Sequence, residues 1–136
     1  LWAALKGSRA LWAWPAAFVG VMLIGGALGM AHVALPFVAP GILASVVVLG
    51  LMVAFAVDLP VAVGAAVVGA FALLHGHAHG TEVAENLGGV EYMAGFAIAT
   101  ATLHATGLGL ALMTRRPLVR VAGAACVVLG VVLVLA

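Results

Sequence analysis

Charged residues are scarce in this chain of 136 residues: they make up 7% of it, while 67% of the residues are hydrophobic. A soluble domain carries roughly 25% charged residues, because it needs them to cover a water-facing surface. The chain cannot cover such a surface, so we predict an integral membrane protein embedded in a lipid bilayer. With only five lysines and arginines in total, it also lacks the basic patch that would bind nucleic acid.

The sequence has one cysteine, and it lacks the common catalytic motifs. The single Cys126 lies in an apolar run, so it forms no intrachain disulfide and is best explained as a small packing residue. The sequence contains neither G-x-x-x-x-G-K-[ST], which binds ATP, nor H-E-x-x-H, which binds zinc in proteases. No Ser or Cys stands near a His in a polar context that would indicate hydrolysis. We therefore predict no enzymatic activity and no organic cofactor.

Long apolar runs separated by short polar or proline-containing breaks predict the architecture. Only helices and closed barrels satisfy their backbone polar groups in lipid, and these runs lack the alternating pattern of a barrel. We therefore predict an all-α, polytopic transmembrane bundle that forms a single domain over residues 1–136. The predicted spans are about 12–34, 42–57, 61–75, 92–113 and 118–136. The second and third are short for a bilayer that needs about 20 residues.

The basic residues indicate how the bundle is oriented. Lys6 and Arg9 precede the first span, and the arginines of 115–120 follow the fourth. Because an even number of spans separates the two groups, both lie on one side, which the positive-inside rule assigns to the cytoplasm. We expect a multi-pass protein of the bacterial inner (cytoplasmic) membrane, with the His- and Glu-rich stretch 76–91 on the outer side.

That stretch begins with an unusual concentration of histidine. Three of the five histidines, His75, His77 and His79, fall within five residues, and Glu82 follows. Imidazole nitrogen and carboxylate oxygen are ligands of borderline divalent cations, and short His-rich tracts are typical of metal binding. The functional interpretation is a divalent-metal capture site at the outer mouth. The structural alternative is a solvated loop in which the histidines are incidental.

The geometry of this segment depends on where the preceding helix ends. On a continuing helix, His75 and His79 share one face, because they are four residues apart, and His77 points away from them. Gly76 and Gly80 weaken such a helix, and either is a candidate for its C-terminal stop. In an unwound end, His77 can turn toward the other two histidines.

Three further residues are candidates outside this segment. His104 lies roughly thirteen residues into the fourth span, about 20 Å along a helix, where an ionisable group is a functional candidate. The alternative is a neutral histidine tied to a neighbouring helix. His32, near the outer end of the first span, either joins the capture site or simply lies at the interface. Asp58 is expected to end a cytoplasmic turn, with release of the cation as the alternative role.

Two segments of the sequence resemble the HupE/UreJ family of nickel and cobalt permeases. One runs from Phe71 to Glu82 and contains the string His-Gly-x-Ala-His-Gly; the other, from Gly95 to Gly107, carries a histidine in a small-residue helix. The resemblance covers essentially the whole chain. The family has an N-terminal helix with the motif His-Pro-x-x-Gly-x-Asp-His, which is absent here. Because Leu1-Trp2-Ala3-Ala4 resembles the residues that follow this motif, we expect a further helix upstream and six spans in the full-length protein.

The leading hypothesis is a secondary permease that imports Ni²⁺, with Co²⁺ as the alternative ion. Its candidate metal ligands are His75, His77, His79, Glu82, His104 and His32. A second hypothesis is a haem-binding membrane anchor, in which paired histidines are axial ligands. A third is a non-transporting, metal-binding accessory or scaffold for metalloenzyme maturation. The sequence does not fix nickel over cobalt: the general affinity order of divalent ions would favour copper at any such site, so selectivity must come from the geometry of the ligands. The sequence also leaves the coupling ion and the oligomeric state open.

Overall fold

The computed structural model describes residues 1–83 and 88–135, and all regular structure in this part of the chain is helical. The helices are α1 (Trp2–Lys6), α2 (Ala10–Met30), α3 (Val38–Ala54), α4 (Val61–Thr81), α5 (Gly89–Met113) and α6 (Arg116–Leu135). Four of the described helices, α2, α4, α5 and α6, are long and apolar enough to cross a membrane, while α3 has 17 residues. The predicted class, a polytopic helical bundle, is confirmed.

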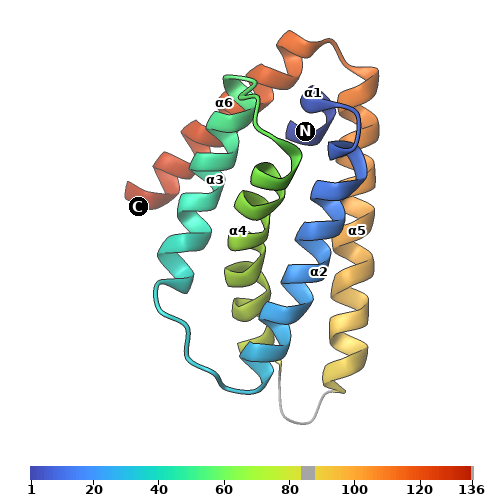
Figure 1. Cartoon of the computed structure of the whole chain (residues 1–136). Helices are drawn as coiled ribbons and strands as arrows, with labels where there is room; N and C mark the ends of the chain where they lie inside the picture. The colour runs from blue at the N-terminus through green and yellow to red at the C-terminus, as the bar shows by residue number, and fades with distance from the viewer. Residues whose placement is uncertain (84–87, 136) are drawn as a thin grey trace.

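The helices α2 to α5 run alternately up and down, so that their connections fall at two opposite ends (Figure 1). Helix α2 packs against α4 and α5, and α3 packs against α6. The short α1 lies at the same end as the α3–α4 and α5–α6 connections (Figure 1). Lys6, Arg116 and Arg120 line one pocket at this end. The two groups of basic residues thus lie on one side of the bundle, which we call the basic end.

Helix α4 extends beyond the predicted span 61–75 and ends one residue after Gly80, the later of the two candidate stops. It begins at Val61, directly after Pro60, a residue that favours helix starts because its φ is already helical. It then passes through Gly76 and Gly80 and ends at Thr81 rather than near His75. Of the predicted outer stretch 76–91, its first six residues are therefore helical, and residues 84–87 lie outside the described residues.

The physical reason is that these glycines form a close contact with α2. A Cβ at Gly76 would run into the carbonyl group of Met22, and a Cβ at Gly80 would run into the backbone of Gly26. On the α2 side, a Cβ at Gly25 would meet the carbonyl oxygen of Leu73. In lipid, helices associate mainly through such close backbone packing. The glycines therefore hold α4 against α2 and do not terminate it.

This contact predicts a large difference between two glycines of the same helix. In Gly25→Ala the new methyl group meets the backbone of α4, so we expect a loss of roughly 1–3 kcal/mol of stability, typical of overpacking. Gly20 has nothing within 4 Å of an added Cβ, so Gly20→Ala should be neutral or stabilising by up to about 1 kcal/mol. Thermal unfolding in detergent measures both, and equal midpoints would contradict the assigned interface.

Candidate metal-binding site

Two histidines of α4 form a pair on the side of the helix that faces α5. The ring centroids of His75 and His79 are 5.0 Å apart, and the rings meet edge-on at 66°. Phe96 of α5 packs against both, with its centroid 5.9 Å from His75 and 4.2 Å from His79. Because α4 stays helical, the two histidines share one face, as their spacing predicted.

The polar partners of His79 are Glu82, which follows α4, and Tyr92, near the start of α5. Its Nδ1 is 3.5 Å from Oε2 of Glu82 and 3.4 Å from the hydroxyl group of Tyr92. The carboxylate nearest to the histidine segment in sequence is therefore also next to His79 in space. Tyr92 was not among the sequence candidates, because its contact depends on how α5 packs against α4.

His104 carries a hydrogen bond that leaves its other nitrogen open. Its Nδ1 lies 2.9 Å from the carbonyl oxygen of Thr100, one turn earlier in α5. A carbonyl oxygen only accepts, so Nδ1 bears the proton, and in the neutral ring Nε2 keeps its lone pair. Histidines that bind metals are usually oriented in this way, by a bond from the opposite ring nitrogen to a backbone carbonyl. The bond lies within α5, so it does not tie α5 to another helix.

An intramembrane cavity of about 440 Å³ is lined by residues of both α4 and α5, the two helices that carry His75 and His104. Residues from all six helices line it, and among them are His75 and His104. The ring of Phe18 contacts both, at centroid distances of 6.0 Å from His75 and 4.8 Å from His104. The lining also includes Ser45 and Cys126. Sequence periodicity could not single out these two residues, because the spans are apolar on every side.

His77 lies on the opposite face of α4 and is buried, with 6% of its surface exposed. Its Nε2 is 2.7 Å from the carbonyl oxygen of Val33, in the connection that follows α2. Nε2 must therefore donate, and Nδ1 is buried with no hydrogen-bond partner in the described part of the chain. The side chain ties the end of α4 to the end of α2, and it does not face His75 and His79.

His32 has a backbone role at the end of α2. Its φ is +54°, its N–H donates to Gly29, and the N–H of Val33 donates to Leu28. This pair of bonds is the Schellman arrangement, in which the left-handed residue is usually glycine. The side chain is exposed, so His32 occupies the helix stop and not the His75–His79 pair.

The structure thus sorts the six sequence candidates into three groups. His75 and His79 form a pair, with Glu82 beside His79, and His104 lines the same cavity as His75. His77 and His32 lie elsewhere. Among residues 1–83 and 88–135, no three histidine, cysteine or acidic side chains converge closely enough to hold an ion together. The arrangement offers successive small sets of ligands, and it contains no closed cage within the described residues.

The long apolar helices define the class of this chain as a multi-pass helical membrane protein. The sequence matches the family described as HupE / UreJ protein over residues 1–133, so the chain belongs to the HupE/UreJ family, a family of membrane transporters associated with nickel uptake. It is 45% identical over 136 residues to Protein HupE from Rhizobium leguminosarum bv. viciae, an alignment that covers 97% of this chain and 71% of that protein. No solved structure matches the chain. The resemblance seen in the sequence is confirmed.

The contrast between His77 and His79 can be tested on purified protein. His77→Ala removes the bond to Val33 and leaves a void between α2 and α4, so we expect a loss of roughly 2 kcal/mol or more. His79→Ala should change stability little, because the ring is partly exposed. In detergent, adding Ni²⁺ should still raise the unfolding midpoint of His77→Ala but no longer that of His79→Ala. An unchanged midpoint for His77→Ala, together with a lost response to Ni²⁺, would instead identify His77 as a ligand.

The backbone role of His32 predicts a gain in stability on substitution, where His77→Ala should lose stability. Because a left-handed conformation is strained for residues with a Cβ, His32→Gly should stabilise the protein by about 1 kcal/mol and leave the response to Ni²⁺ unchanged. His32→Ala keeps the strain and removes only the imidazole, so it serves as the matched control. A lost response to Ni²⁺ in both variants would show that the imidazole, and not the backbone, is what matters.

Proposed function

We propose that the chain is a secondary permease that imports Ni²⁺, with Co²⁺ as the alternative ion. One observation carries the proposal: His75 and His104, from different helices, line the same intramembrane cavity. An ionisable side chain at such a position is costly, and it indicates a pathway for ions or protons. The family to which the chain belongs supports transport in general, and the histidines supply the chemistry for a borderline divalent cation.

In this proposal the ion enters at the end of α4 farthest from the basic end. Glu82 and His79 take the first position. The carboxylate attracts the cation, and its Oε2 lies 3.5 Å from Nδ1 of His79. His75 follows one helical turn inward, with its ring 5.0 Å from that of His79. His104 takes the last position, through the nitrogen that does not bond to Thr100. Phe96 packs against His75 and His79, and Phe18 contacts both His75 and His104.

Sets of one or two ligands suit transport better than a tight site does. Conduction requires binding that is strong enough to admit an ion and weak enough to release it. The driving force need not come from ATP. A divalent cation that moves down an inside-negative potential gains about 4.6 kcal/mol per 100 mV, twice the single-charge value. A hundred millivolts therefore outweighs a concentration gradient of roughly a thousandfold.

Release at the basic end requires movement there. The rings of Trp2 and Trp14 lie 4.3 Å apart beside the cavity, and the two indole N–H groups donate to the carbonyl oxygens of Val57 and Val61. Asp58, the carboxylate considered for release, is paired with Lys6. This exposed pair adds to the contacts between α1 and the α3–α4 connection, and in this proposal the ion passes when the group of contacts opens.

The two alternative functions are less well supported. For a haem anchor, two imidazoles must reach opposite sides of one iron, whereas Phe18 contacts both His75 and His104. A non-transporting accessory protein would use the same outer ligands to bind metal. It would not need a histidine beside an internal cavity, so the role of His104 separates that alternative from import.

Accumulation of radiolabelled nickel in cells expressing the protein tests the proposal. We expect His79→Ala and His104→Ala each to lower the initial uptake rate at least tenfold, because each removes a station on the path. His32→Ala should behave like the wild type, since that side chain is exposed and apart from the cavity. Amounts of protein in the membrane must be matched, because a folding defect would also lower uptake.

The outcomes distinguish the hypotheses. If the wild type does not accumulate nickel while the purified protein binds it, the protein is an accessory and not a permease. If His104→Ala accumulates nickel at the wild-type rate, the proposed path through the cavity is wrong, although an outer binding site remains. A visible absorption band of purified protein would favour the haem anchor.

A further inference from the structure

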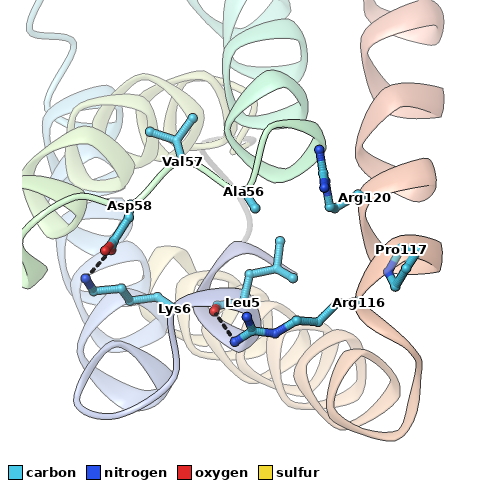
Figure 2. A pocket seen from close by; sticks show the side chains of 8 residues that line it. All are labelled: Leu5, Lys6, Ala56, Val57, Asp58, Arg116, Pro117 and Arg120. Carbon is cyan, nitrogen blue, oxygen red and sulfur yellow. Dashed lines mark hydrogen bonds and ion pairs between the residues drawn. The ribbon is translucent and has the colours of Figure 1, made fainter.

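A second pocket, at the basic end of the bundle, contains none of the proposed metal ligands. Its volume is about 390 Å³, and its lining is Leu5, Lys6, Ala56, Val57, Asp58, Arg116, Pro117 and Arg120. Figure 2 shows the polar members arranged around it, contributed by α1, α6 and the connection between α3 and α4. The space corresponds to about a dozen water molecules, so it admits a polar group of moderate size.

The charge of this lining is positive. Lys6, Arg116 and Arg120 bring three positive charges, and Asp58 brings one negative charge, which leaves a balance of two. Lys6 and Asp58 pair with each other (Figure 2). The excess therefore belongs to the two guanidinium groups of α6, and the pocket repels a divalent cation and attracts an anion.

The two arginines are oriented but not neutralised. Nη2 of Arg116 donates to the carbonyl oxygen of Leu5 at 3.1 Å, and Nε of Arg120 donates to the carbonyl oxygen of Ala54 at 2.7 Å. Neither forms an ion pair with a carboxylate among residues 1–83 and 88–135. A guanidinium has five N–H donors, so each retains several that a phosphate can accept in the bidentate geometry that arginine favours.

The position of the pocket selects the kind of anion. It lies where α3 ends and α6 begins, that is, at the ends of membrane helices, the level of lipid phosphate groups. Beside it in sequence are the exposed apolar residues Phe55, Leu118 and Val121, with 69%, 59% and 63% of their surfaces exposed. Acyl chains can pack against such side chains. Basic pockets between membrane helices are known to bind anionic head groups.

We propose that this pocket binds the phosphate group of an anionic phospholipid, held by Arg116 and Arg120. The net positive charge favours an anionic lipid such as phosphatidylglycerol over a zwitterionic one. In phosphatidylcholine, the positive charge of the choline group cancels the negative charge of the phosphate. A soluble phosphate has the same binding chemistry but lacks acyl chains, so it should bind much more weakly. The proposal does not depend on which metal ion is transported, or on whether any is.

The test is a titration of the purified protein with ligand in neutral detergent, in which the unfolding midpoint is measured at each ligand concentration. Three ligands are compared: phosphatidylglycerol, phosphatidylcholine with the same acyl chains, and inorganic phosphate. For the wild type, phosphatidylglycerol should raise the midpoint at a concentration roughly tenfold below that of phosphatidylcholine, and millimolar phosphate should have little effect. R116Q/R120Q should need at least tenfold more phosphatidylglycerol than the wild type.

The matched control is R9Q/R115Q. It removes the same charge from two exposed arginines that do not line the pocket, and it should respond like the wild type. If both double variants lose the response to phosphatidylglycerol equally, general surface charge attracts the lipid, and the proposed site is wrong. An equal response of the wild type to both lipids would also overturn it, even if R116Q/R120Q did not fold. A response to inorganic phosphate as strong as to phosphatidylglycerol would retain the anion site and reject the lipid as its occupant.

Discussion

The close approach of α2 and α4 is the contact on which the rest of the structure depends. At Gly25 and Gly29 on one helix and at Gly76 and Gly80 on the other, an added Cβ would meet backbone atoms of the facing helix. Because Gly76 and Gly80 are held there, the histidine segment between them stays helical instead of unwinding. The helical course places His75 and His79 on one face of α4, where His75 lines the cavity, and it places the glycines and His77 against α2 and the connection that follows it.

The sequence predicted the class, the membrane helices and the shared face of His75 and His79, because these follow from composition and from a period of 3.6 residues. It left the end of α4 open, with Gly76 and Gly80 as candidate stops. Glycine both weakens helices and permits close contacts between them, and only the position of α2 decides between the two. Gly25 and Gly29 have the G-x-x-x-G spacing of a helix-contact motif, and Gly76 and Gly80 have the same spacing. Their place beside histidines favoured a loop instead.

His77 and His104 show why residue type alone cannot assign a role. Each bonds to one backbone carbonyl, His77 through Nε2 to Val33 and His104 through Nδ1 to Thr100. The bond of His77 joins two helices, and its remaining nitrogen is enclosed. The bond of His104 lies within one helix, and the residue lines a cavity. The first arrangement stabilises packing, whereas the second leaves one nitrogen without a backbone partner, as the permease proposal requires of a ligand. No pattern in the sequence distinguishes the two, since both depend on which helix lies opposite.

The two ends of the bundle attract opposite charges, and this links the two proposals. Glu82 and the histidine pair favour a cation at one end, while the pocket beside Arg116 and Arg120 carries a net charge of two positive units at the other. A divalent cation about 10 Å from that pocket is repelled by roughly 2 kcal/mol in water, and by more where the dielectric constant is lower. A lipid phosphate in the pocket would cancel part of this repulsion. In a bilayer rich in anionic lipid, the barrier to release at the basic end should therefore be lower than in a neutral one, without any change in the histidine stations.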